Sequence, residues 1–97
     1  MVGPHPALIV SSDRLNRASR TILACPLTSQ MRHDPAVFMP PYLVPATARA
    51  TGLSRDGYVK ADQVHTLPFQ ALGPRMGRAN PEVMTAVDEA LMFVLGL

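Results

Sequence analysis

NPEVMTAVDEALMFVLG, residues 80–96, carries the clearest helical pattern in this 97-residue chain. Asn80 is a good N-cap, Pro81 suits the first helical position, and Glu82 complements the positive end of the helix dipole. Apolar residues recur at helical spacing from residue 83 to residue 94, and Gly96 stands where a helix commonly ends. The pattern predicts a helix over residues 81–95, about 22 Å long.

Short apolar runs precede this helix. Pro6–Ser11 and Arg20–Leu27 are compact strand candidates, and Gly57–Leu67 is the longest one. Ala36–Met39 is expected to be a short edge strand because prolines follow it, and Gly73–Arg78 is a fifth short piece. We expect loops or turns at three places between these runs: residues 13–17, which are basic, residues 31–35 and residues 46–57. Five short strands and a terminal helix predict a mainly β (α+β) fold, a small and strongly bent sheet or barrel.

Length and composition set outer bounds on the protein class. A chain of 97 residues predicts one domain, residues 1–97. No apolar run approaches the roughly 20 residues that a membrane helix needs, and no secretory leader is visible. The single cysteine, Cys25, fits a reducing cytosol and excludes a metal site of the cysteine-pair type. We therefore expect a cytoplasmic protein that does not contact a membrane.

Charge is distributed unevenly along the chain. Residues 1–79 carry all nine basic residues and four acidic ones, which gives +5, whereas residues 80–97 carry three acidic residues and no base, which gives −3. A basic body favours a polyanionic partner, either a nucleic acid or an acidic protein segment. A solvated surface of mixed sign is the alternative.

Five short motifs follow one another from residue 6 to residue 97. They are PALIVS at 6–11 with Asp13 and Asn16, CPLTSQ at 25–30, ADQV and HTL at 61–67, LG with GR at 72–78, and DEAL at 88–91 before a terminal Leu-Gly. In this order and spacing they resemble the MazF/PemK toxins. The resemblance implies an SH3-like barrel of about five strands with a C-terminal helix, usually as a homodimer. Family members cut single-stranded RNA at short sequences without a metal, and a cognate antitoxin inhibits them.

The chain departs from the family pattern at its N-terminus. Family members usually begin with a further strand and a loop that ends in an arginine, so the domain is expected to lack its usual first strand and loop. The family arginine falls at His5, whereas Thr28 matches the threonine of the family's catalytic pair. The resemblance therefore implies His5 and Thr28 as catalytic candidates, with the arginine replaced.

The chemistry of RNA cleavage agrees with these residue types. RNA can be cut by its own 2′-hydroxyl, so an enzyme needs only to move protons and stabilise the charged phosphate. Histidine can move protons at neutral pH, whereas arginine supplies a fixed charge and a bidentate phosphate contact. His5 would thus retain proton transfer and lose charge stabilisation, and Thr28 would donate a hydrogen bond to a phosphate oxygen. The alternatives are an exposed terminal histidine without a role and a hydroxyl that caps a turn.

Other polar residues complete the set of candidates. We expect RNA binding by Arg14, Arg17, Ser29, Gln30 and Arg32, and the alternative for the arginines is a solvated loop. The three histidines lack metal-ligand spacing, so no metal and no other cofactor is expected. Cys25 is expected to be a small core residue rather than a nucleophile. Asp62 and Gln63 interrupt an apolar strand candidate, where they would brace the barrel through hydrogen bonds or contact RNA.

Three classes of function remain open from the sequence. The first is the toxin of a type II toxin–antitoxin pair, a metal-independent endoribonuclease that acts on single-stranded mRNA. The second is a catalytically inactive remnant that binds an antitoxin or nucleic acid, with a role in operator-bound complexes. The third is an inhibitor of a DNA-associated enzyme, because the CcdB-type toxins share this fold and fold does not decide function.

Overall fold

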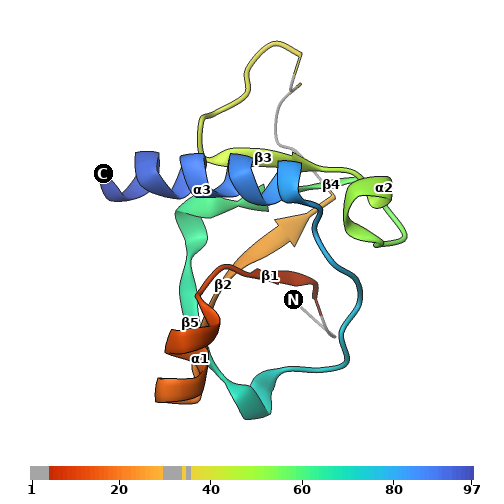
Figure 1. Ribbon diagram of the computed structural model, residues 1–97. Helices are drawn as coiled ribbons and strands as arrows, with labels where there is room; N and C mark the ends of the chain where they lie inside the picture. Colours follow the sequence, from red (N-terminus) through yellow and green to blue (C-terminus); the bar gives the residue numbers. More distant parts are fainter. Residues whose placement is uncertain (1–4, 30–33, 35) are drawn as a thin grey trace.

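The computed structural model describes residues 5–29, 34 and 36–97. Figure 1 shows five short strands with a long C-terminal helix lying across one end of them, and a short helix at the opposite end. Two 3-10 turns, η1 and η2, flank the last strand. The elements in chain order are β1 (Ala7–Ile9), α1 (Asp13–Ser19), β2 (Thr21–Thr28), β3 (Leu43–Ala46), α2 (Ala48–Thr51), β4 (Gly57–Lys60), η1 (Ala61–Gln63), β5 (His65–Pro68), η2 (Phe69–Ala71) and α3 (Pro81–Leu95).

The strand β2 is the centre of the sheet, as its apolar sequence predicts. It pairs antiparallel with β1 along one edge, and with β5 and then β4 along the other. The edge strand β3 pairs with β4, which gives the order β1-β2-β4-β3 with β5 beside β2. This antiparallel sheet with a terminal helix confirms the α+β fold class.

The longest strand candidate, Gly57–Leu67, is in fact two strands. Leu27 faces Val59 and Ala24 faces His65, so three residues along β2 correspond to six along its partner. The 3-10 turn η1 takes up the three extra residues, and the sheet bends there. The prediction of one continuous strand was therefore wrong. The position of the break depends on how the segment pairs with β2, which the segment's own sequence does not show.

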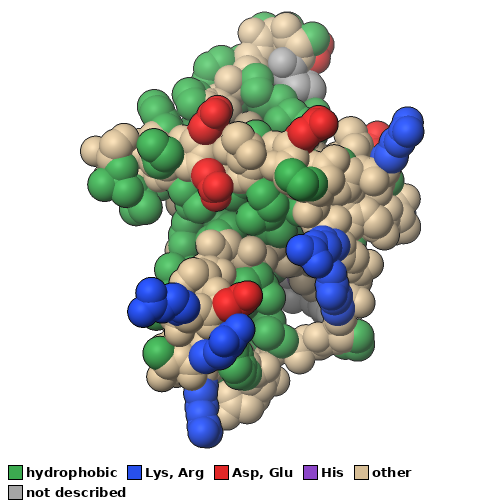
Figure 2. Space-filling model, viewed as in Figure 1, with side chains coloured by type: hydrophobic (Ala, Val, Ile, Leu, Met, Phe, Trp, Pro, Cys, Tyr) green, Lys and Arg blue, Asp and Glu red, His purple; other side chains and the backbone are tan. Residues whose placement is uncertain are grey.

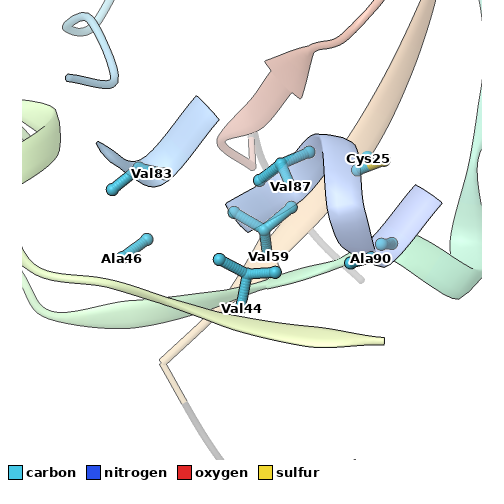
Figure 3. Packing of buried hydrophobic residues seen from close by; sticks show 8 residues of the cluster. Cys25, Val44, Ala46, Val59, Val83, Val87 and Ala90 are labelled. Carbon is cyan, nitrogen blue, oxygen red and sulfur yellow. The ribbon is translucent and has the colours of Figure 1, made fainter. Parts of the chain in front are cut away.

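The core lies between α3 and the sheet. Val83, Val87 and Ala90 point from α3 toward Val44, Ala46 and Val59 of the strands, and Cys25 of β2 belongs to the same cluster (Figure 3). Val87 and Cys25 are fully buried. Three of the core positions are alanines. Because an alanine side chain is small, the helix can pack closely against the sheet at these positions. The helix predicted at residues 81–95 is confirmed, including its N-cap, where Asn80 Oδ1 accepts from the Val83 N–H at 2.9 Å.

Residues 13–17, expected to be a loop, form most of helix α1. Ser12 is its N-cap and accepts from the Leu15 N–H, and Asp13 lies in the positively charged first turn. The Ser11 hydroxyl donates to Asn16 Oδ1 and accepts from the Leu23 N–H at 2.9 Å, which ties the helix to β2. The family-like residues Ser11 and Asn16 therefore hold α1 in place.

Three further expectations about loops and strands were wrong. Ala36–Met39 is a turn and extended chain rather than a strand, and the edge strand is Leu43–Ala46, which accommodates Pro45. The expected loop 46–57 contains α2, whose N-cap Thr47 accepts from the Ala50 N–H. Gly73–Arg78 forms no strand, and its end is fixed by the Arg78 N–H, which donates to the Thr51 carbonyl at 2.9 Å. The expected turn 31–35 lies outside the described residues except for Asp34.

Among the described residues, no helix combines the length and the apolar character needed to cross a membrane.

Candidate functional site

The C-terminal end of β2 brings the two expected catalytic residues to one place. Ala7 faces Pro26 in the β1–β2 ladder, and the Leu27 N–H donates to the Pro6 carbonyl at 3.2 Å, which extends this ladder by one residue. Continuing the same register places His5 directly opposite Thr28. Opposite residues of an antiparallel pair have Cβ atoms about 4.5–5.5 Å apart and side chains on the same face. His5 is exposed and Thr28 is half-buried.

On its other edge, Thr28 is held by the start of β4. Thr28 faces Tyr58 in the β2–β4 ladder. The preceding residue, Gly57, lies so close to β2 that a Cβ there would stand 2.7 Å from the Thr28 carbonyl oxygen. The site is therefore a short row of three residues across the sheet, His5, Thr28 and Tyr58, with Thr28 in the middle. We call it the Thr28 row.

The other expected RNA contacts divide into three groups. Ser29 follows Thr28 and is exposed at this end of the sheet. Gln30 and Arg32 lie outside the described residues. Arg14 and Arg17 are exposed on α1, which leads into the opposite end of β2 (Figure 1).

The arginines of α1 are far from Thr28. Seven residue steps separate Thr21 from Thr28, and at about 3.3 Å per step this end-to-end distance is roughly 23 Å. Arg14 and Arg17 therefore belong to a separate basic surface that the structure does not bring to the Thr28 row. The side chains of Lys and Arg are accordingly spread over several regions in Figure 2, whereas acidic side chains gather over α3.

Two residues near Thr28 were not singled out from the sequence. Tyr58 is half-buried beside Thr28, and Arg55 is exposed two residues before Gly57. Arg55 lies in the bend before β4, and Tyr58 is the second residue of that strand, a place where sequence alone gives no sign of a site. The β2–β4 register, which joins residues thirty positions apart, is what places Tyr58 beside Thr28.

Cys25 behaves as a core residue, as expected. Its thiol is fully buried, and burial raises its pKa from the ordinary value of 9.0 to about 11, with a further contribution from the charge of Asp62. A neutral, buried thiol is a poor nucleophile. Asp62 and Gln63 are exposed in η1 rather than inside a strand.

Metal ligation finds no support in the arrangement of the described side chains. Across residues 5–29, 34 and 36–97, no three His, Cys, Asp or Glu side chains come together in a way that could hold a metal ion. His65 instead lies on β5, where its Nδ1 is 3.1 Å from the Gln63 carbonyl oxygen. The side chains of the Thr28 row offer proton transfer and hydrogen bonding.

Two adjoining hollows of about 310 and 300 Å³ lie between β3 and α3. They share Val44, Pro45 and Ala86, and the carboxylates of Glu82 and Glu89 line their α3 side. Negative charge in an apolar groove disfavours a phosphate backbone. These hollows are therefore poor candidates for an RNA site, and the Thr28 row is the better one.

Comparisons with known proteins agree on one family. The family of the PemK-like, MazF-like toxins of type II toxin–antitoxin systems matches residues 1–95. Endoribonuclease EndoA of Bacillus subtilis is 30% identical over 95 residues, which cover 98% of this chain and 78% of the relative. Endoribonuclease MazF4 of Mycobacterium tuberculosis is 36% identical over 96 residues, which cover 98% of this chain and 82% of the relative.

Solved structures give the same result. An endoribonuclease in complex with its cognate antitoxin from a mycobacterial species superimposes with a TM-score of 0.81 at 33% identity, over 98% of this chain and 84% of the other. A MazE–MazF structure from Deinococcus radiodurans gives a TM-score of 0.75 at 26% identity, over 96% and 83% of the two chains. With the fold, the motifs and the family match in agreement, the chain belongs to the PemK-like, MazF-like toxins of type II toxin–antitoxin systems.

Proposed function

We propose that this protein is the toxin of a type II toxin–antitoxin pair and cuts single-stranded mRNA at short sequences without a metal ion. Its relatives EndoA and MazF4 are endoribonucleases. The observation that supports the proposal is the β1–β2 register, which, when continued beyond Ala7 and Pro6, sets His5 opposite Thr28 at the end of the central strand.

The reaction that fits these side chains is internal transesterification of RNA. The 2′-oxygen attacks the neighbouring phosphorus, the bond from phosphorus to the 5′-oxygen breaks, and the products are a 2′,3′-cyclic phosphate and a 5′-hydroxyl. One proton leaves the 2′-hydroxyl and one joins the departing 5′-oxygen. No oxidant, reductant or second substrate is needed.

His5 and Thr28 have distinct roles in this scheme. The His5 imidazole is the group that takes part in these proton transfers, since histidine exchanges protons at neutral pH. The Thr28 hydroxyl donates to a phosphate oxygen, where negative charge grows in the transition state. Because His5 replaces the arginine of the family pattern, the fixed positive charge is missing, and we expect slow cleavage.

The partners follow from charge and from the relatives. We propose one domain over residues 1–97 that forms a homodimer and is inhibited by a cognate antitoxin in the cytoplasm, where mRNA is found. The mycobacterial relative was solved with its cognate antitoxin. An acidic antitoxin segment suits the basic body of this chain, which carries +5 over residues 1–79.

The test is cleavage of end-labelled single-stranded RNA in the presence of a chelator. We expect slow cleavage that leaves cyclic phosphate ends, a large loss in Thr28→Val, and partial rescue in Thr28→Ser, which restores the hydroxyl. Thr28→Val keeps the branched shape, so folding is preserved and can be checked by circular dichroism. Cleavage that vanishes on chelation, or that is unchanged in Thr28→Val, contradicts the proposal.

The replacement of the arginine by His5 favours a second candidate, a binding remnant. Such a protein would keep the antitoxin and RNA surfaces without cutting. It is supported if no cleavage occurs with any RNA sequence while the antitoxin and RNA are still bound.

A further inference from the structure

We propose that Tyr58 is an RNA-binding residue that stacks on a base next to the phosphate held by Thr28. This inference rests on the proposed function, because it assumes that single-stranded RNA lies along the Thr28 row. It adds a contact that does not depend on His5 and that would anchor RNA of any sequence.

The sheet register places Tyr58 beside Thr28. Thr28 faces Tyr58 in the β2–β4 ladder, and Tyr58 faces Pro45 in the β3–β4 ladder. Side chains directly opposite each other lie on the same face of an antiparallel sheet. The ring and the hydroxyl therefore project to the same side, with their Cβ atoms about 4.5–5.5 Å apart.

The alternation along β4 turns this side away from the core. Val59 follows Tyr58, is 1% exposed and belongs to the buried cluster under α3. Successive side chains of a strand point to opposite faces, so Tyr58 projects from the face opposite the core. It is half-buried there, which leaves part of the residue accessible to a ligand.

The backbone of Tyr58 is fixed from both sides. Tyr58 pairs with Thr28 of β2 on one edge of its strand and with Pro45 of β3 on the other. A tyrosine has few rotatable bonds, so little entropy is lost when it binds a ligand. A base can thus stack on Tyr58 with little loss of conformational entropy.

Stacking suits this position because the nucleotide whose phosphate meets Thr28 carries its base within a side chain's length. Base–aromatic stacking depends on the π-face that all bases share, so it gives affinity without reading sequence. Arg55, three residues before Tyr58 in the chain, is exposed and carries positive charge, which favours a nucleic acid.

Tyrosine fluorescence tests the contact directly. The chain has two tyrosines and no tryptophan, so in Tyr42→Phe all the emission comes from Tyr58. Tyr42 precedes β3 and its carbonyl accepts from the Ala61 N–H, which places it at the other end of β4. The probe is a short single-stranded RNA with a 2′-O-methyl group on every sugar, so that binding is measured without cleavage. We expect the RNA to quench Tyr42→Phe strongly and Tyr58→Phe little.

Affinity gives an independent measurement. We expect Tyr58→Val to weaken the Kd by about 5- to 150-fold on RNAs of different sequence, and Tyr58→Phe to leave it nearly unchanged. Valine suits a strand, and a thermal melt verifies the fold of each variant. Tyr42→Val is the matched control and should bind as the unmodified protein does.

Different failures point to different proposals. If the unmodified protein binds RNA but Tyr58→Val binds it equally well, or if bound RNA does not quench Tyr58, the stacking role is wrong and the proposed function stands. If the unmodified protein binds no single-stranded RNA, both proposals fall together.

Discussion

A β-carbon on Gly57 would stand 2.7 Å from the carbonyl oxygen of Thr28. The obstacle is the backbone of a paired strand, which cannot move aside as a flexible side chain can. The start of β4 thus reaches the end of β2 because residue 57 has no side chain. The pairing of Thr28 with Tyr58 depends on this close approach.

Replacing Gly57 should therefore damage both stability and the site. We expect Gly57→Ala to lower the free energy of unfolding by about 1–3 kcal/mol, because the added methyl group must push the two strands apart. RNA cleavage should fall as well, since Thr28 and Tyr58 lose their register. Urea unfolding and the RNA assay measure the two effects. Gly73→Ala is the control: a Cβ there meets nothing within 4 Å, so its effect should stay within about 0.5 kcal/mol.

Restoring the arginine at position 5 tests the catalytic row. We expect His5→Arg to raise the rate of RNA cleavage by about 10²–10³, the usual value of one preorganised group that stabilises transition-state charge. The control is His65→Arg, which adds the same charge at an exposed position on β5. A rate that instead drops in His5→Arg would identify the imidazole as an indispensable acid or base.

The arginines of α1 should act on binding rather than on chemistry. Arg14 and Arg17 are exposed on α1, which leads into the end of β2 opposite Thr28. We expect Arg14→Gln with Arg17→Gln to weaken RNA binding at low salt and to reduce the salt slope by up to about 0.7 per lost phosphate contact. Turnover at saturating RNA should be unchanged. A double variant with normal salt dependence would leave these arginines as solvated surface.

Local sequence signals predicted the elements that depend on local interactions. The ends of α3 are determined by Asn80, Pro81 and Gly96, all of which lie within the helix or next to it, so the prediction was accurate. Ser12 provides the same kind of capping signal, but residues 13–17 were predicted to be a loop because they are polar and basic. The helix there is short and carries no buried side chain, so no apolar pattern marks it.

Features that depend on pairing could not be predicted in this way. The break between β4 and β5 follows from the three extra residues that β2 leaves unpaired in its partner. The site shows the same division. Thr28 and His5 were chosen by resemblance, whereas their convergence, and the place of Tyr58 beside Thr28, come from registers between strands far apart in sequence.

Cys25 makes the stability of the protein fall as the pH rises in the alkaline range. Burial, with the charge of Asp62, raises the pKa of its thiol from 9.0 to about 11. Between these values the unfolded chain loses the proton while the folded protein keeps it, so the unfolded state binds fewer protons and stability falls as the pH rises. The contribution is complete below about pH 9, declines up to about pH 11 and is level above it.

The size of this effect is bounded by the shift in pKa. A shift of about two pKa values corresponds to a loss of at most about 2–3 kcal/mol across that interval. Urea unfolding of the unmodified protein and of Cys25→Ala from pH 7 to pH 11.5 isolates it, because the two proteins differ only at residue 25 and the other contributions cancel in the difference. We expect Cys25→Ala to be less stable at pH 7, where it leaves a cavity, and to approach the unmodified protein as the pH rises. Curves that stay parallel over the whole range would show that the buried thiol titrates alike in both states.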